Sequence, residues 1–184
     1  MSNQITGKNV AILATDGYEQ VELTEPKAAL EKAGATVHVL SIKTGEIKGW
    51  DKTDWGKFVK VDKLVTDVKT TDYDALVLPG GQINPDKLRM DKDAVAFIME
   101  FAESGKTVAA ICHGPWGLIE AGVVKGKTMT SWPSLHTDLI NAGAHWVDKE
   151  VVQDGNIITS RKPEDIPEFN KSIIAALENA PEQK

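Results

Sequence analysis

The sequence predicts an α/β fold in which helices cover both faces of a mostly parallel sheet. Short runs rich in aliphatic and β-branched residues alternate with helical patterns along the chain, which is the pattern of βαβ units. Two of these runs, residues 9–15 and 74–78, are apolar at most positions, as strands covered on both faces should be. The 184 residues suit one domain, 1–184, because no repeat, linker or low-complexity segment divides them.

The first half of the chain contains three predicted strands and two predicted helices. The strand at 9–15 ends at Asp16-Gly17, a turn signal, and a helix over 22–33 stops at Gly34. A strand over 36–42 follows. The polar stretch 43–62, which contains Trp50 and Trp55, is predicted to form a β-hairpin that projects from the main sheet. After the strand at 74–78, Pro79-Gly80-Gly81 forms a turn, and a helix runs from Pro85 to a stop at Gly105.

The second half is organised around a predicted central strand, residues 107–111, which runs straight into Cys112. A short helix over 117–121 follows, then a strand-like segment at 127–130 and a helix over about 134–142. Asp154-Gly155 predicts a β-hairpin between residues 150–152 and 157–159. A last helix over 167–178 completes the set.

Composition and charge exclude several classes of function. The formal net charge of −6 argues against nucleic acid as the main partner, since phosphate binding needs a basic face. No apolar run approaches the roughly 20 residues of a spanning helix, so we expect a cytoplasmic protein without a membrane partner. A single cysteine leaves no sulfur pair for zinc, and no metal or other cofactor is predicted.

Cys112 is the candidate nucleophile because a strand feeds directly into it and a helix follows. That arrangement is typical of a nucleophile elbow, which lifts the side chain clear of the sheet. Gly114 permits a tight turn, and Pro115 suits the first turn of a helix. The helix N-terminus is expected to lower the pKa of the thiol and favour thiolate. The competing interpretation is a buried inert thiol, the commoner fate of an arbitrary cysteine.

The Gly80-Gly81 turn is predicted to face the same crevice as the cysteine, since the two preceding strands should be neighbours. The backbone N–H of Gly81, together with that of His113, would form an oxyanion hole for a tetrahedral intermediate. A glycine pair after a strand is a weak signal alone, because ordinary turns use it often.

Four segments taken together resemble the DJ-1/PfpI superfamily: residues 16–22, 75–81, 110–115 and 159–161. Within it, the chain is similar to the branch of PfpI-type intracellular peptidases and stress proteins. The resemblance implies a flavodoxin-like three-layer sandwich of the class I glutamine amidotransferase type. It also implies a reactive cysteine, assembly into a homo-oligomer (dimer or hexamer), and peptidase, glyoxalase or deglycase activity.

The resemblance also implies roles for individual residues. Cys112 matches the nucleophile, His113 the adjacent histidine, and Glu19 the acid that hydrogen-bonds the cysteine sulfur. Because side chains of sequence neighbours tend to diverge, His113 is a poor partner for Cys112 in a simple triad. Asp86 matches an acid that a neighbouring subunit supplies to the histidine, on a loop one residue longer. An alternative role for Asp86 is a first-turn helix acid favoured by the helix dipole.

Trp116 departs from the glutamine that many relatives place after the Cys-His-Gly-Pro run. A large indole there would narrow the pocket and favour small carbonyl substrates over a peptide chain. Core packing is the competing interpretation, since it is the commoner fate of tryptophan.

Three functions follow from these residues. In the first, Cys112 attacks small carbonyl compounds or their adducts on glycated proteins and releases a hydroxy acid. In the second, the same sulfur cleaves peptides with His113 and Asp86 as base and orienter. In the third, the protein is a non-catalytic stress protein, either a redox sensor with an oxidisable cysteine or a chaperone-like holdase.

Overall fold

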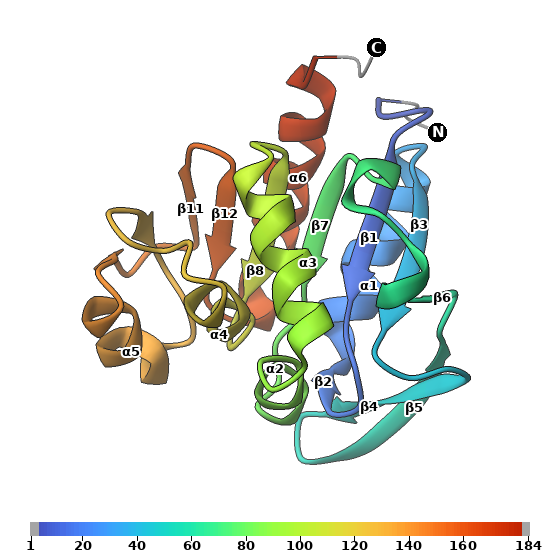
Figure 1. Cartoon of the computed structure of the whole chain (residues 1–184), viewed down its shortest axis with the longest axis horizontal. Coiled ribbons are helices and arrows are strands. Elements are labelled where there is room, and N and C mark those ends of the chain that lie inside the picture. The colour runs from blue at the N-terminus through green and yellow to red at the C-terminus, as the bar shows by residue number, and fades with distance from the viewer. Residues whose placement is uncertain (1–3, 182–184) are drawn as a thin grey trace.

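The computed structural model describes residues 4–181, and its centre is a seven-stranded sheet (Figure 1). The spatial order is β11-β12-β8-β7-β1-β3-β6, and all neighbouring strands are parallel except the β11–β12 hairpin. In chain order the strands are β1 (Asn9–Leu13), β3 (Thr36–Ser41), β6 (Lys63–Leu64), β7 (Ala75–Leu78), β8 (Thr107–Ile111), β11 (Val151–Asp154) and β12 (Ile157–Ser160). The predicted α/β class and mostly parallel sheet are confirmed.

Helices cover both faces of this sheet, which gives three layers (Figure 1). One face carries α1 (Gln20–Lys32) and α6 (Ile166–Asn179), which pack against each other. The other face carries α3 (Lys92–Glu103), α4 (Pro115–Glu120) and α5 (His136–Asn141). Short 3-10 helices complete the connections: η1 (Val65–Asp67), η2 (Thr70–Asp72), η3 (Pro133–Leu135) and η4 (Pro163–Asp165).

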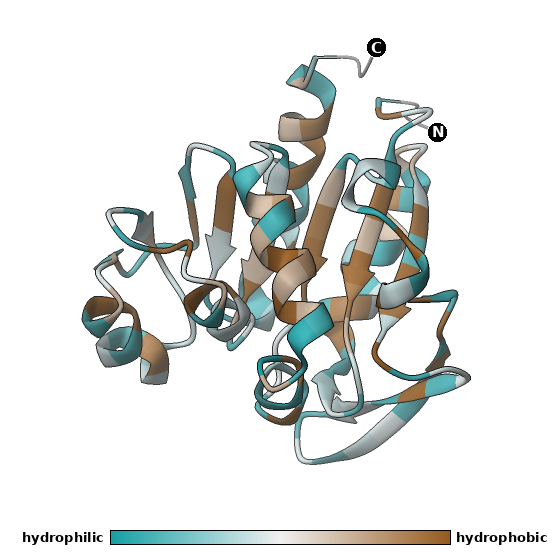
Figure 2. Cartoon of the chain, in the orientation of Figure 1, coloured by the Kyte–Doolittle hydropathy of each residue, from teal (hydrophilic) through white to brown (hydrophobic). Residues whose placement is uncertain are grey.

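Alternate residues of each central strand enter different cores. In β1, Val10 and Ile12 pack with the α1 and α6 side, whereas Ala11 and Leu13 pack with the α3 and α4 side. All four side chains are fully buried. Because successive side chains of a strand point to opposite faces, a strand buried on both faces must be apolar throughout. Figure 2 shows the resulting hydrophobic colour along the central strands.

The helix predicted to run from Pro85 to Gly105 is wrong in one respect, because the chain forms two helices there. α2 (Ile83–Leu88) ends before α3 begins, and Asp91 is the N-cap of α3. Its side chain accepts a hydrogen bond of 2.9 Å from the N–H of Ala94. A capping aspartate offers this free amide a partner, so a new helix starts at that point.

The predicted hairpin at 43–62 belongs to a small second sheet beside the main one. β4 (Glu46–Asp51) pairs with β5 (Asp54–Lys60) and with β2 (Tyr18–Glu19). Figure 1 shows this hairpin projecting next to α2, below the carboxyl ends of the parallel strands. The turn of the hairpin is therefore at the end of the sheet where Cys112 lies.

The remaining elements differ from the prediction mainly at their ends. α4 begins at Pro115 rather than at residue 117, and the last helix extends one residue further at each end than predicted. β9 (Thr128–Met129) falls in the strand-like segment predicted at 127–130, but its parallel partner β10 (His145–Trp146) was not predicted. Within residues 4–181, none of the helices has both the length and the apolar character needed to cross a bilayer.

Candidate active site

Cys112 lies at a sharp bend between β8 and α4. Its φ of 62° is in the left-handed region, which side chains other than glycine, asparagine and aspartate rarely adopt. Backbone hydrogen bonds fix the bend on both sides. The N–H of Cys112 donates to the carbonyl of Ser160 at 3.0 Å, and its carbonyl accepts from the N–H of Trp132 at 2.9 Å. Strain at a residue that its neighbours hold in place is a feature of functional sites.

The acid beside the sulfur is Glu22, and the prediction that Glu19 contacts Cys112 is wrong. Glu22 is fully buried, and its Oε1 accepts a hydrogen bond of 2.9 Å from the N–H of Gly80. A Cβ placed on Gly80 would lie 2.6 Å from this oxygen and 2.7 Å from the Cβ of Cys112. The carboxyl group and the cysteine therefore flank the same glycine at close range.

Glu19 faces the projecting hairpin instead of the sulfur. Its Oε1 accepts a hydrogen bond of 3.1 Å from the N–H of Lys52, at the hairpin turn. The physical reason is the start of α1 at Gln20, which leaves Glu19 outside the helix and puts Glu22 in its first turn. Glu22, Pro26 and Leu30 share the buried face of α1 at a spacing of four residues. That spacing was the signal in the sequence for the inward-facing acid.

Burial dominates the protonation of Glu22 and Cys112. It raises the pKa of Glu22 well above the ordinary value, against the opposing hydrogen bond from Gly80. It also raises the pKa of the Cys112 thiol, and the charge of Glu22 adds to that effect. The expectation of a lowered thiol pKa is therefore wrong for this chain. Two buried acids that interact this closely titrate as a pair, and each keeps its proton to a higher pH than it would alone.

The two amides predicted to form an oxyanion hole converge on the sulfur. The N–H groups of Gly81 and His113 both hydrogen-bond Cys112 and thereby oppose the rise in its pKa. Gly81 has a φ of 76°, which favours glycine. The N–H of Gly80 is occupied by Glu22, so Gly80 positions the acid and offers no donor to a substrate.

His113 turns toward Cys112, although the two side chains were predicted to diverge. Its Nδ1 lies 3.2 Å from Sγ, and its Nε2 lies 3.4 Å from the Oγ of Ser134. The left-handed backbone of Cys112 accounts for this convergence, since it turns the chain sharply between the two residues. Burial lowers the pKa of His113 to about 4, so the ring is neutral near pH 7.

Asp86 lies in α2, exposed, and is paired with Arg89 at 2.7 Å. Within residues 4–181 of this chain, it makes no hydrogen bond or ion pair with His113. A contact between Asp86 and His113 of a neighbouring subunit stays a prediction.

Trp116 does not line the cavity above Cys112, so the prediction that it narrows the pocket is wrong. Its Nε1 donates to Asp138 at 3.0 Å, its ring packs on the core beneath α3 and α4, and the Arg89 guanidinium lies 4.3 Å from its ring centre. Trp50, from the hairpin, and Trp132, which follows β9, are the indoles of the cavity wall.

The cavity has a volume of about 560 Å³ and places Cys112 in its wall. A volume of this size accommodates a small organic molecule. Among the described residues, no group of three or more histidine, cysteine or acidic side chains is placed to hold a metal ion. The lining residues are Gly17, Glu19, Glu22, Trp50, Lys52, Gly81, Gln82, Ile83, Cys112, His113, Trp132, Pro163 and Glu164.

Comparisons with known proteins show which proteins this chain is similar to. The chain is 42% identical to Deglycase TK1284 of Thermococcus kodakarensis over 168 residues, which cover 91% of this chain and 98% of that protein. It is 43% identical to General stress protein 18 of Bacillus subtilis over 175 residues, which cover 94% and 99% of the two chains.

Solved structures show the same fold. Drosophila melanogaster DJ-1beta matches with a TM-score of 0.85 at 31% identity, over 98% of this chain and 92% of that one. A two-domain protein of Anabaena variabilis with DJ-1/ThiJ/PfpI-like and ferritin-like domains matches with a TM-score of 0.87 at 39% identity. The match covers 92% of this chain and 48% of that protein. The family model described as "DJ-1/PfpI family" matches residues 8–176, and the chain therefore belongs to the DJ-1/PfpI family.

Proposed function

We propose that this protein is a cysteine-dependent hydrolase that acts on small reactive carbonyl compounds or on their adducts. The observation that carries the proposal is the convergence of Glu22, Gly81 and His113 on the sulfur of Cys112 in the wall of one cavity. The name of the 42% identical deglycase supports this class of chemistry. A stress-related role is in keeping with the name of General stress protein 18.

The first step is attack of the Cys112 sulfur on the aldehyde carbon of a 2-oxoaldehyde, as the thiol passes its proton to the neutral His113 ring, whose Nδ1 lies 3.2 Å away. A carbon–sulfur bond forms, and the electron pair of the carbonyl moves to its oxygen. Glu22, which burial keeps protonated, gives its proton to this oxygen, so the product is a neutral hemithioacetal. The N–H groups of Gly81 and His113, which hydrogen-bond the sulfur before the attack, would stabilise the negative charge on the oxygen before that transfer.

The second step converts the hemithioacetal into the thioester of a 2-hydroxy acid. The Glu22 carboxylate takes the proton from the former aldehyde carbon, and the neighbouring carbonyl carbon receives a proton in return. Water then cleaves the thioester, releases the hydroxy acid and regenerates the thiol, and the proton held by His113 passes to Glu22. The net reaction adds one water molecule to the 2-oxoaldehyde, so no oxidant or reductant is required.

Peptide hydrolysis is a less favoured use of the same nucleophile. It requires a protonated ring beside the sulfur to give a proton to the leaving amine, and burial lowers the pKa of His113 to about 4, which disfavours that form. It also requires a group that orients the ring, yet the described partner of its Nε2 is the hydroxyl of Ser134 rather than a carboxylate. Carbonyl chemistry needs only groups that this chain already brings together.

The test of the proposal is turnover of methylglyoxal by the wild type and by Cys112→Ala. We expect turnover to disappear in the variant while thermal unfolding stays cooperative. Turnover that persists in Cys112→Ala would rule out the cysteine route. If neither protein turns over methylglyoxal, yet peroxide converts Cys112 to a sulfinic acid detectable by mass, the redox-sensor function takes its place.

A further inference from the structure

Glu164 is a carboxylate in the wall of the Cys112 cavity that none of the steps above uses. It lies in η4, exposed at the cavity surface, next to Pro163, which also lines the cavity. Its charge reaches the catalytic pair, because it contributes to the raised pKa of Glu22. Within residues 4–181, no hydrogen bond or ion pair of the Glu164 side chain is found.

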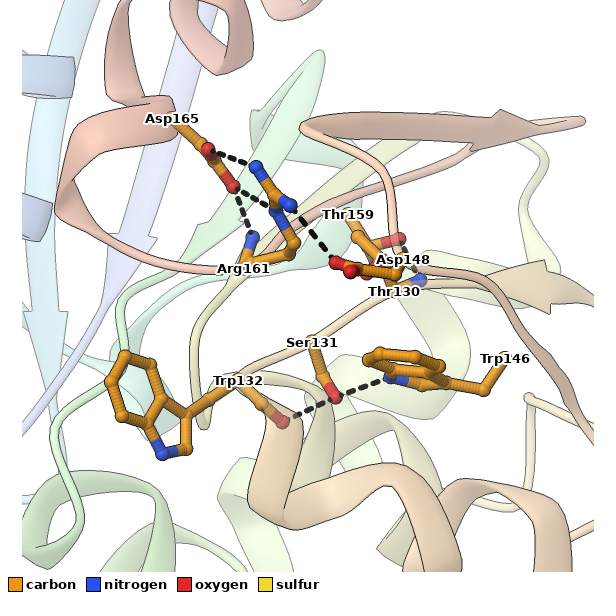
Figure 3. A network of polar contacts seen from close by, with 8 residues as sticks. All are labelled: Thr130, Ser131, Trp132, Trp146, Asp148, Thr159, Arg161 and Asp165. Carbon is orange, nitrogen blue, oxygen red and sulfur yellow. Dashed lines mark hydrogen bonds and ion pairs between the residues drawn. The ribbon is translucent and has the colours of Figure 1, made fainter.

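Hydrogen bonds between Arg161 and Asp165 hold the turn that carries Glu164 (Figure 3). The Arg161 guanidinium donates to both carboxylate oxygens of Asp165, at 2.9 and 3.0 Å, and the N–H of Arg161 donates to the same carboxylate at 2.9 Å. A further guanidinium nitrogen donates to Asp148 at 2.9 Å. Asp165 is almost fully buried. A two-pronged pair of this kind fixes geometry as well as charge, so Glu164 stays at the cavity.

The other charges around the cavity do not neutralise Glu164. Glu19 interacts with the positive charge of Lys52, whose N–H it also binds. Glu22 is kept neutral by burial. One carboxylate is thus left uncompensated at the cavity, between walls that include Trp50 and Trp132. Indole faces attract cations, which adds to the same preference.

We propose that Glu164 is a specificity-determining residue, which makes the cavity prefer carbonyl compounds with a cationic group over those with a carboxylate. This inference rests on the proposed reaction at Cys112. A charge at the mouth of a cavity with low-dielectric walls raises the local concentration of counter-ions and lowers that of ions of like sign. The effect acts on the approach to Cys112, so it is measurable without turnover.

The test uses three methanethiosulfonate reagents of similar size, which form a mixed disulfide with Cys112. One carries a trimethylammonium group, one a sulfonate and one a neutral hydroxyl group. The second-order rate constants are measured at low salt for the wild type, for Glu164→Gln and for Glu168→Gln. Glu168 is the matched control, because it lies in the first turn of α6, pairs with Lys171 and does not line the cavity.

We expect Glu164→Gln to lower the ratio of the cationic to the anionic rate constant by about fivefold. The ratio should be unchanged in Glu168→Gln, and the difference between wild type and Glu164→Gln should collapse at about 1 M salt, where screening is strong. An equal ratio in the wild type and Glu164→Gln would overturn the inference and leave the proposed function standing. If Cys112 of the wild type reacted with none of the reagents, both the inference about Glu164 and the proposed function would fail, since the sulfur would be out of reach of small molecules.

Discussion

The N–H of Gly80 donates a hydrogen bond of 2.9 Å to Oε1 of Glu22, and this bond anchors a buried carboxyl group beside Cys112. Three elements meet at this point: α1 supplies the acid, the turn after β7 supplies the amide, and β8 leads into the sulfur. The absence of a side chain at residue 80 is what allows the acid and the cysteine to approach the same position.

The first prediction concerns which of two acids moves protons. Glu22→Gln keeps the shape of the side chain and the oxygen that Gly80 binds, but an amide has no proton of comparable acidity to give. We expect kcat for methylglyoxal to fall by about a hundredfold, the usual contribution of a positioned acid or base. Glu19→Gln is the matched control and should keep most of the wild-type kcat. A comparable loss in both variants would contradict the assignment.

The second prediction concerns the space at Gly80. Gly80→Ala places a methyl group within 2.7 Å of both Glu22 and Cys112, so the acid or the sulfur must move. We expect a lower kcat and a loss of roughly 2 kcal/mol in the free energy of unfolding, as for other overpacked sites. Urea titration and initial rates measure the two effects.

The control for Gly80→Ala is Gly117→Ala in α4. There the nearest atom to an added methyl group is the Cδ1 of Ile98 at 3.1 Å, the end of a flexible side chain. Alanine is also the better helix former. Gly117→Ala should therefore unfold at nearly the wild-type urea concentration, and a loss equal to that of Gly80→Ala would show that the cavity geometry is not the cause.

The fold followed from hydrophobic patterning because the strands are buried on both faces. β1, β7 and β8 are apolar runs of four or five residues. A run of that length is too short for a typical helix and fits a strand that is buried on both faces. The break between α2 and α3 depends on one side-chain hydrogen bond, that of Asp91, inside an otherwise helical pattern. Strand β10, the partner of β9, escaped prediction because a strand of two residues carries no alternation of polar and apolar side chains.

The position of Cys112 followed from the sequence, but the identity of its acidic neighbour did not. Glu19 and Glu22 are three residues apart, so a shift of one helical turn decides which of them faces the sheet. Likewise, the direction of His113 depends on the left-handed φ of Cys112, a backbone conformation that the sequence does not suggest for cysteine. Trp132 reaches the cavity through the fold rather than through any local motif.

The third prediction concerns the pH dependence of stability. Below about pH 4.5, the ordinary pKa of a glutamate, both the folded and the unfolded chain hold the proton of Glu22. As the pH rises, the unfolded chain releases this proton first, because burial raises the pKa in the folded state. The free energy of unfolding therefore falls with rising pH, until the raised pKa is passed.

Glu22→Gln removes this group, so the variant should gain stability relative to the wild type between about pH 5 and pH 8. Urea titrations of both proteins across that range measure the difference. Glu168→Gln provides the control, since it leaves Glu22 and the neighbouring Glu19 in place and should keep the fall with pH. If the difference in the free energy of unfolding between the wild type and Glu22→Gln stayed the same across this pH range, Glu22 would have its ordinary pKa in the folded protein.

The last prediction concerns the ion pair between Arg161 and Asp165 beside the cavity. Arg161→Met leaves the carboxylate of Asp165, which is 2% exposed, without its guanidinium partner. We expect a loss of about 2 kcal/mol in the free energy of unfolding, below the full penalty of a broken buried pair because water reaches part of Arg161. The control, Lys171→Met, breaks an exposed ion pair with Glu168 and should leave the melting temperature unchanged. Arg161→Lys keeps the positive charge but loses the bidentate pair with Asp165, so it should lower the ratio of cationic to anionic reagent rates at Cys112, because Glu164 is then held less firmly at the cavity. Unaltered stability of Arg161→Met together with an unaltered ratio in Arg161→Lys would show that the turn is fixed by its packing rather than by Arg161.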